Sequence, residues 1–217
     1  LSLTLSLLLI LPFSLLISAQ EAEPENEVVE EVVVTGIKQS LISAIDIKRS
    51  NVGVVDAITA EDFGKFPDNN LAESLARVVG IGIDRNNVEG ERVAVRGFGP
   101  ELNLVTLNGR QMPTVPGQWG GGRSFNFGDI SSHGISAVEV YKSTNSSLPS
   151  GGIGSTINMV TTKPLAVNGS LNSFSVDMLN DSTSNDSLKP EFNFVHSSNF
   201  GKFGFAISGS FQDRNNV

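Results

Sequence analysis

Cysteine is absent from this chain of 217 residues, and its two histidines, one tryptophan and one tyrosine make those residue types scarce. Without thiols, the sequence excludes disulfide scaffolds, thiolate zinc clusters and thiol catalysis. His133 and His196 are isolated, and neither has a helical partner at metal-ligand spacing. We therefore expect no metal site and no cofactor.

Basic residues are absent from residues 1–37, which hold six glutamates. The rest of the chain carries the other 17 of the 23 acids against all 15 bases, so the net charge of −8 belongs to an N-terminal tail. An acidic tail with no basic patch argues against a nucleic-acid partner.

Signatures of an enzyme are also missing. The glycine turn at 152–156 is not followed by the lysine of a phosphate-binding loop, and the third glycine of a dinucleotide fingerprint is absent. No Gly-x-Ser-x-Gly elbow accompanies a credible triad. We expect no catalytic residues.

Residues 1–19 form an apolar run that Pro12 interrupts and that ends on the small residues Ser18 and Ala19. This pattern predicts a secretory signal peptide. A transmembrane helix is the alternative, but the apolar stretch is short and no basic stop-transfer cluster follows. The initial Met and the positive n-region are missing, so we expect the chain to begin inside a longer gene product.

The β-branched run of residues 30–36, EEVVVTG, follows this signal directly and predicts an extended strand. It lies on a Glu-rich stretch with Pro24, and we interpret residues 20–51 as a flexible tether. A free strand presents unpaired backbone groups to the sheet edge of a partner. The alternative is an ordinary first strand of the next domain. A loosely helical pattern over 40–49 predicts a short helix within the tether.

Residues 52–165 are predicted to form a small α+β domain with a mixed sheet. Apolar residues at helical spacing over 71–79 predict a buried-face helix that Gly80 ends. Asn108 and Gly109 predict a hairpin turn. The predicted strands are 52–58, 81–84, 92–96, 103–107, 137–141 and 157–161.

Several segments of this domain carry a resemblance to a known family. They are RGFGP at 96–100, NLVTLNGR at 103–110, VEVYKS at 138–143 and GGIGSTINMVTTKP at 151–164. Together and in this order they resemble the plug domain of TonB-dependent outer-membrane receptors. The run Glu31, Val32, Val33, Val34 and Thr35 resembles the TonB box of that family, which implies the periplasmic domain of TonB as a partner.

The resemblance implies a plug inside a large transmembrane β-barrel, and residues 166–217 are consistent with the first three or so barrel strands. Aromatic and aliphatic residues alternate with small or polar ones around 173–178, 191–194 and 203–211, as outer-membrane lipid requires of a barrel strand. A soluble sandwich produces the same alternation. Because large transporters have about 22 strands, we expect the chain to be an N-terminal fragment.

The segment 111–127 is too long and too aromatic for a simple connection, and we expect it to face a ligand. Its candidate contacts are Gln111, Gln118, Trp119, Arg123 and Phe125, although Trp119 and Phe125 could instead pack against the barrel wall. Arg92, Arg96 and Arg110 could bind an anion, but we interpret them, together with Glu139, as polar contacts between plug and barrel.

The function that these residues and the resemblance imply is TonB-dependent uptake of a scarce nutrient across the outer membrane of a Gram-negative bacterium. The segments FGKFPD at 63–68 and LAESL at 71–75 resemble a pattern of the receptor subgroup associated with carbohydrate uptake, which favours an oligosaccharide as the cargo. A receptor for a siderophore or vitamin B12 has the same architecture. An exported β-rich adhesin or binding protein without a pore is the alternative from another class.

Overall fold

The computed structural model of the chain describes residues 26–60, 70–86, 89–114, 123–128, 130–166, 169–179 and 189–212, with side chains from Lys38 onward in the first range. The chain divides into two compact units, residues 1–35 and residues 36–217. The predicted signal peptide lies outside the described residues, as does the 63–68 part of the subgroup pattern.

The helices in chain order are α1 (Asn26–Ser50), α3 (Leu71–Leu75) and the 3-10 turns η1 (Pro100–Leu102) and η2 (Pro164–Ala166). The strands are β1 (Val55–Thr59), β2 (Ile81–Asn86), β3 (Glu89–Val95), β4 (Asn103–Leu107), β5 (Arg110–Gln111), β6 (Ile135–Tyr141), β7 (Ser155–Thr161), β8 (Ser170–Leu179), β9 (Lys189–Asn199) and β10 (Gly204–Gln212). No helix among these described residues is long and apolar enough to cross a membrane.

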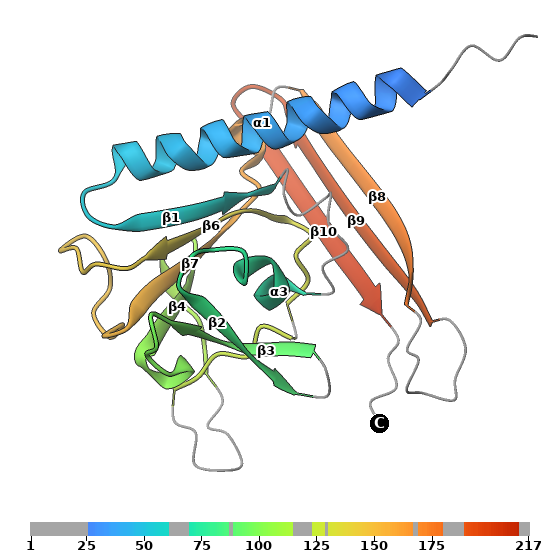
Figure 1. Cartoon of the computed structure of the whole chain (residues 1–217). Helices are drawn as coiled ribbons and strands as arrows, with labels where there is room; N and C mark the ends of the chain where they lie inside the picture. The colour runs from blue at the N-terminus through green and yellow to red at the C-terminus, as the bar shows by residue number, and fades with distance from the viewer. Residues whose placement is uncertain are drawn as a thin grey trace, which may run out of the picture. The chain divides into compact units, whose positions relative to one another are not determined.

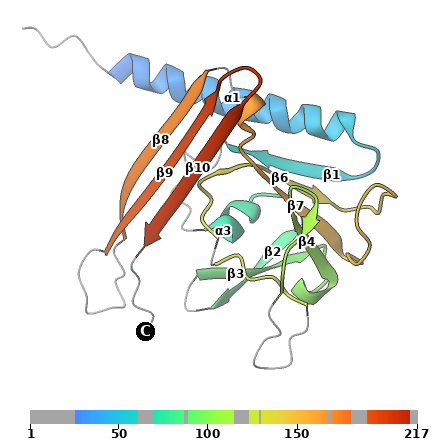
Figure 2. The same cartoon turned by 180° about the vertical axis from the view of Figure 1, so that it is seen from behind.

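A five-stranded sheet with the order β1-β6-β7-β4-β5 organises the middle of the chain (Figures 1 and 2). Strands β4 and β7 are parallel, whereas the other neighbours are antiparallel. The expected mixed sheet is therefore confirmed. Asn108, with a φ of 50°, and Gly109, with a φ of 79°, make the predicted turn between β4 and β5.

One face of this sheet carries the hydrophobic core. Val138 and Val140 of β6 and Ile157 and Met159 of β7 are fully buried there, because alternate residues of a strand point to the same face. Helix α3 contributes Leu71, Ala72 and Leu75, β3 contributes Val93 and Val95, and Phe125 and Phe127 complete the cluster. The core thus joins the sheet, α3 and the β2–β3 hairpin.

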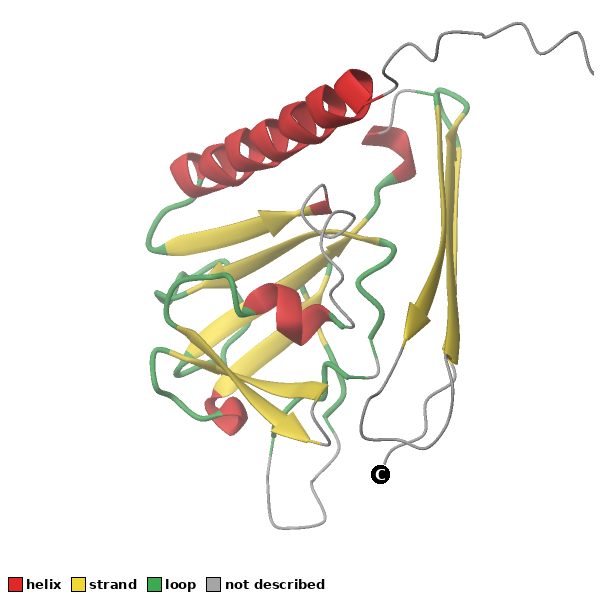
Figure 3. Cartoon of the chain, turned by 45° about the vertical axis from the view of Figure 1, so that its right-hand side comes forward, coloured by secondary structure: helices red, strands yellow, loops and turns green. Residues whose placement is uncertain are grey.

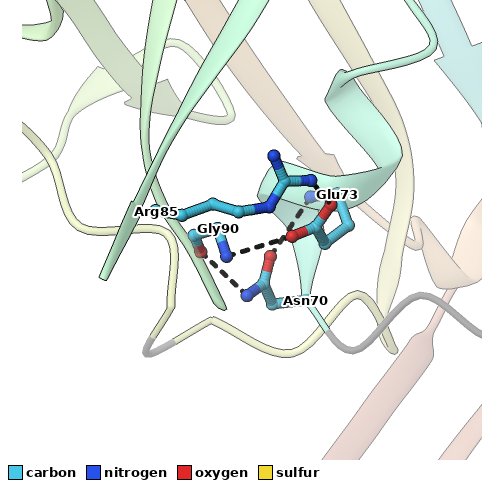
Figure 4. Close-up of polar contacts among 4 residues, drawn as sticks. All are labelled: Asn70, Glu73, Arg85 and Gly90. Atoms are coloured by element: carbon cyan, nitrogen blue, oxygen red, sulfur yellow. Dashed lines mark hydrogen bonds and ion pairs between the residues drawn. The ribbon is translucent and has the colours of Figure 1, made fainter. Parts of the chain in front are cut away.

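Polar contacts attach α3 to the β2–β3 hairpin (Figure 4). The Asn70 side chain caps α3 by accepting from the Glu73 N–H (3.2 Å) and donates to the Gly90 carbonyl (2.8 Å). Glu73 in turn accepts from the Gly90 N–H (3.0 Å) and the Arg85 guanidinium (2.7 Å). A Cβ on Gly90 would meet the Glu73 carboxylate at 3.0 Å, so this close approach favours glycine.

Helix α3 is shorter than its periodicity predicted. It ends at Leu75, and the backbone then tightens, with Arg77 and Val78 bonding the carbonyls three residues back, before Gly80 turns with a φ of 77°. Val78 is buried in this turn, whereas Val79 is 84% exposed. The predicted place of Val79 on the buried helix face is therefore wrong, because the helical period stops before it.

A three-stranded antiparallel sheet, in the order β10-β9-β8, forms the C-terminal part of the structure (Figure 3). Leu171 and Val195 lie on one face of this sheet, whereas its register places eight aromatic and aliphatic residues on the other face, where each is more than 40% exposed. These residues, which we call the apolar strand face, are Phe174, Val176, Met178, Phe192, Phe194, Phe205, Ile207 and Phe211. On the opposite face, Asn193 and Ser197 are buried. The predicted alternation is confirmed.

We expect Asn70→Ala to lower the free energy of unfolding by about 2 kcal/mol, because it removes a helix cap and leaves the Gly90 carbonyl without that partner. Urea unfolding of the chain, followed by circular dichroism in detergent, measures the change. Asn86→Ala, at the exposed end of β2, is the matched control and should shift stability by less than about 0.5 kcal/mol. Equal midpoints for the two variants would contradict the assigned role of Asn70.

Candidate functional site

The candidate partner-binding segment, residues 31–35, lies in helix α1 rather than in a free strand. The predicted extended conformation is therefore wrong for the chain alone. A lone strand leaves its backbone groups unpaired, whereas a helix satisfies them within the segment. The predicted helix over 40–49 is confirmed but is part of this longer α1. Recognition of a partner by residues 31–35 stays a prediction.

The C-terminal half of α1 is attached to β1, the edge strand of the sheet. The Thr59 hydroxyl donates to the Ser40 carbonyl (3.4 Å), and Lys48 Nζ lies 2.6 Å from Asp56 Oδ1. The second oxygen of Asp56 accepts from Lys142 Nζ at 2.5 Å. Lys142 follows β6, so a single carboxylate links α1, β1 and the end of β6.

Lys142 is the most enclosed of these charges, with 7% of its side chain exposed. Its ammonium also donates to the Val79 carbonyl at 2.5 Å. Burial on its own would raise the pKa of Asp56, but hydrogen bonds and the charges of Lys142 and Lys48 outweigh burial and hold that pKa below its ordinary value. The carboxylate therefore stays ionised at neutral pH and balances both lysines.

Glu139 lies on the face of the sheet opposite the core. Its Oε2 accepts from the Tyr141 hydroxyl (2.8 Å) and from Asn158 Nδ2 (3.0 Å). The Asn158 Oδ1 accepts from the Thr106 hydroxyl and the Gly109 N–H, each at 2.9 Å. These bonds form a polar ladder across β6, β7 and β4, so Glu139 organises the plug sheet itself. Its contact with a barrel wall stays a prediction.

The three arginines that the sequence proposed with Glu139 do not gather in one site. Arg96, with a φ of 54°, donates from Nη2 to the Gly154 carbonyl at 3.1 Å and so attaches the glycine loop to the β3 hairpin. Arg92 lies 3.9 Å from Glu91, and Arg110 is exposed in β5. Their proposed contacts with the barrel are likewise untested.

The candidate ligand loop is described only at its ends. Gln111 is exposed in β5, and Arg123 is exposed beside Gly151. Phe125 is 8% exposed and packs edge-to-face on Phe127, with ring centroids 4.9 Å apart. The structure therefore contradicts Phe125 as a ligand contact, because its ring belongs to the core. Gln118 and Trp119 lie outside the described residues.

The glycine loop 151–154 serves close packing. A Cβ on Gly154 would approach Asn103 Oδ1 to 2.6 Å, and the Gly154 N–H donates to the Leu102 carbonyl at 2.9 Å. Asn103 is buried, donates to the Val93 carbonyl (2.9 Å) and accepts from the Ser155 hydroxyl (2.8 Å). The loop that superficially suggested phosphate binding thus joins β3, β4 and β7.

Sequence reasoning missed the residues that connect the plug-like domain with the C-terminal strands. The His133 ring lies 3.2 Å from Ser131 Oγ through Nδ1 and 3.3 Å from Ser175 Oγ of β8 through Nε2. The Asn193 side chain of β9 accepts from the Ser131 hydroxyl (3.5 Å) and donates to Ser175 (3.4 Å) within the C-terminal sheet. The polar side of the 173–178 and 191–194 alternation was the available signal, whereas nothing in the sequence pointed to His133.

In the part of the chain that the structure describes, no three His, Asp or Glu side chains form a group that could hold a metal ion.

Solved structures of outer-membrane receptors share this fold. The siderophore receptor PirA from Acinetobacter baumannii is similar with a TM-score of 0.57 and 23% identity, over 77% of this chain and 25% of that chain. The ferric enterobactin receptor PfeA from Pseudomonas aeruginosa is similar with a TM-score of 0.58 and 20% identity, over 77% of this chain and 25% of that chain. This chain thus spans about a quarter of the length of these receptors. A comparison with curated proteins found no match.

The mixed sheet followed by two-faced antiparallel strands is the part of the fold that this chain shares with these receptors. The family model of the TonB-dependent Receptor Plug Domain matches residues 47–156, half of the chain. The chain therefore belongs to the TonB-dependent receptors, as its sequence motifs indicated. Residues 47–156 include β1, Glu139 of the polar ladder and most of the core, and they end just before Ile157, Asn158 and Met159 of β7.

We expect the polar ladder to make stability sensitive to alkali. Burial, then the hydrogen bond and charge of Glu139, raise the pKa of Tyr141 to about 12. Because the native state favours the neutral phenol, this contribution is complete below pH of about 10 and is lost as pH rises through about 12. Urea midpoints of the wild type and Tyr141→Phe should therefore converge over that range. A difference that does not change with pH would contradict the coupling to Glu139.

Proposed function

We propose that this chain is the N-terminal part of an outer-membrane receptor that takes up a scarce nutrient with energy delivered by TonB. The observation that carries the proposal is the two-faced C-terminal sheet. Its apolar strand face is exposed, while on the opposite face Ser175 bonds to His133 of the plug domain and Asn193 bonds to Ser131. A membrane strand needs this arrangement, since lipid offers no partner to polar groups.

The apolar strand face is proposed to contact outer-membrane lipid. In barrels of this kind, outward residues are apolar and inward residues are polar, which is the alternation that β8, β9 and β10 show. Residues 1–19 would direct export into the periplasm of a Gram-negative bacterium. The rest of the barrel would be supplied by further strands of the longer receptor.

We expect Phe194→Arg to destabilise the membrane-folded state of the full-length receptor by about 2–4 kcal/mol if the residue lies near the bilayer midplane. Ser173→Arg is the matched control, because Ser173 lies on the opposite face in the register of β8 and β9. Folding into liposomes, followed by heat-modifiable migration on gels, measures both variants. Equal loss in the two variants would contradict a lipid-facing role for Phe194.

Residues 31–35 are proposed to leave helix α1 and add as a strand to the periplasmic domain of TonB. Val32, Val33, Val34 and Thr35 are β-branched, and Gly36 follows them. β-Branched residues have low helix propensity, and glycine costs about 1 kcal/mol more than alanine in a helix. Opening α1 at this point is therefore inexpensive compared with the backbone bonds that a partner strand would supply.

We expect Val33→Pro to abolish uptake while leaving ligand binding intact, because proline removes a pairing N–H from residues 31–35. Val29→Pro is the matched control: it places proline in the first turn of the same helix but leaves the pairing segment unchanged, so it should retain uptake. Cellular uptake and binding to purified receptor are measured in parallel. Normal uptake by the Val33 variant would contradict the proposed coupling.

The cargo that we propose is an oligosaccharide, with the pattern at 63–75 as its support. PirA and PfeA are named as a siderophore receptor and a ferric enterobactin receptor, but at 20–23% identity they indicate a common fold and not a common cargo. Labelled malto- and xylo-oligosaccharides, ferric enterobactin and vitamin B12 are suitable probes. Uptake of only ferric enterobactin or vitamin B12 would overturn the choice of a sugar.

A poreless adhesin is the competing function. The full-length protein decides between the two, since a receptor must partition into the outer membrane and a secreted adhesin need not. Recovery of the full-length protein only as a soluble species would refute the receptor.

A further inference from the structure

Strand β1 is one of the two edges of the plug sheet and has β6 as its neighbour. The part of helix α1 from residue 36 onward lies along the other side of β1 and is held there by polar contacts (Figure 1). Ser40 contacts Thr59 and Lys48 contacts Asp56, so the helix and the strand run in opposite directions. Leu41, Ile42 and Ile45 remain 56%, 42% and 44% exposed. These apolar side chains of α1 are therefore only about half covered.

The two bonds that Asp56 makes differ in their surroundings. Toward α1, Asp56 Oδ1 binds Lys48, whose side chain is 51% exposed and is therefore open to water and salt. Toward the sheet, Oδ2 binds Lys142, which is 7% exposed and also donates to the Val79 carbonyl. Removing one partner of an enclosed charge costs far more than removing one from an exposed pair. The inner bond is thus the stronger one.

Backbone bonds add to the inner attachment of β1. All five residues of β1 pair with β6, from Val55 opposite Tyr141 to Thr59 opposite Ala137. The Lys142 N–H also donates to the Val54 carbonyl at 2.8 Å. A displacement of α1 therefore breaks the weaker contact, the Lys48–Asp56 ion pair, before it breaks the stronger pairing between β1 and β6.

We propose that Asp56 is the positioning residue that couples α1 to the plug, and that α1 detaches from β1 at the Lys48–Asp56 bond before β1 detaches from β6. The inference rests on the proposed function, in which TonB pulls on residues 31–35 at the other end of the same helix. The first product of the pull is then a plug whose sheet is intact and whose β1 edge is uncovered. Asp56 remains bound to Lys142 throughout this step.

Amide hydrogen exchange of the purified full-length receptor in detergent, read by mass spectrometry without TonB, tests the order of detachment. Lys48→Gln should speed exchange in residues 38–50 by about two- to fivefold, the effect expected of a half-exposed ion pair, and leave residues 55–59 unchanged. Lys38→Gln makes the same charge change on an exposed position of α1 and should leave both segments unchanged. Lys48→Arg should restore slow exchange.

The salt dependence of amide exchange distinguishes an electrostatic role of Lys48 from a purely steric one, because salt does not alter a steric contact. Raising ionic strength to about 1 M shortens the screening length to about 3 Å, so the difference between wild type and Lys48→Gln should shrink. Asp56→Asn should speed exchange in residues 38–50 and also in residues 55–59, because it weakens both bonds. This variant distinguishes loss of the outer bond from loss of both.

Two results would overturn the inference: unchanged exchange of residues 38–50 in Lys48→Gln, or equal acceleration of residues 38–50 and 55–59 in that variant. Failure of the proposed function is a separate outcome, since it is measured as uptake by Val33→Pro in cells. Normal uptake by that variant together with the predicted exchange pattern would refute the coupling to TonB and retain the order of detachment.

Discussion

The buried ammonium of Lys142 needs partners, and several elements of the plug supply them. A charge removed from water is tolerated only with a counter-charge and further hydrogen bonds, and here these come from Asp56 and the Val79 carbonyl. They bring the edge strand β1, the end of β6 and the turn after α3 to one place. The same carboxylate also holds Lys48, so the N-terminal helix is attached to the plug at the group that balances Lys142.

Each of the two sheets has one apolar face and one polar face. The plug sheet places Val138, Val140, Ile157 and Met159 against α3 and the β2–β3 hairpin and leaves the Glu139 ladder on the other side. The C-terminal sheet reverses this pattern: its apolar strand face is exposed, and its polar face meets the plug at His133. Apolar groups on the outside and polar groups on the inside are what a receptor in a membrane with a plugged interior requires.

Local patterns predicted most of the elements, and the failures have physical causes. The strands around 103–107, 137–141 and 157–161 followed from β-branched runs and turn residues, and their positions are confirmed. Residues 31–35 are helical because an isolated strand has no partner for its backbone. Val79 is exposed because α3 ends early, and Phe125 is buried because its ring completes a core that no local window contains.

The sequence by itself determined the plug family, the mixed sheet and the two-faced C-terminal strands, because motifs, turn residues and period-two alternation are local properties of the chain. Only the tertiary structure decided which charges meet. Asp56 meets Lys142, 86 positions along the chain, because β1 pairs with β6, and His133 meets Ser175 of β8, 42 positions along, because the C-terminal sheet contacts the plug there. No local pattern encodes such distances along the chain, since they depend on how strands pair within a sheet and on where the two sheets meet.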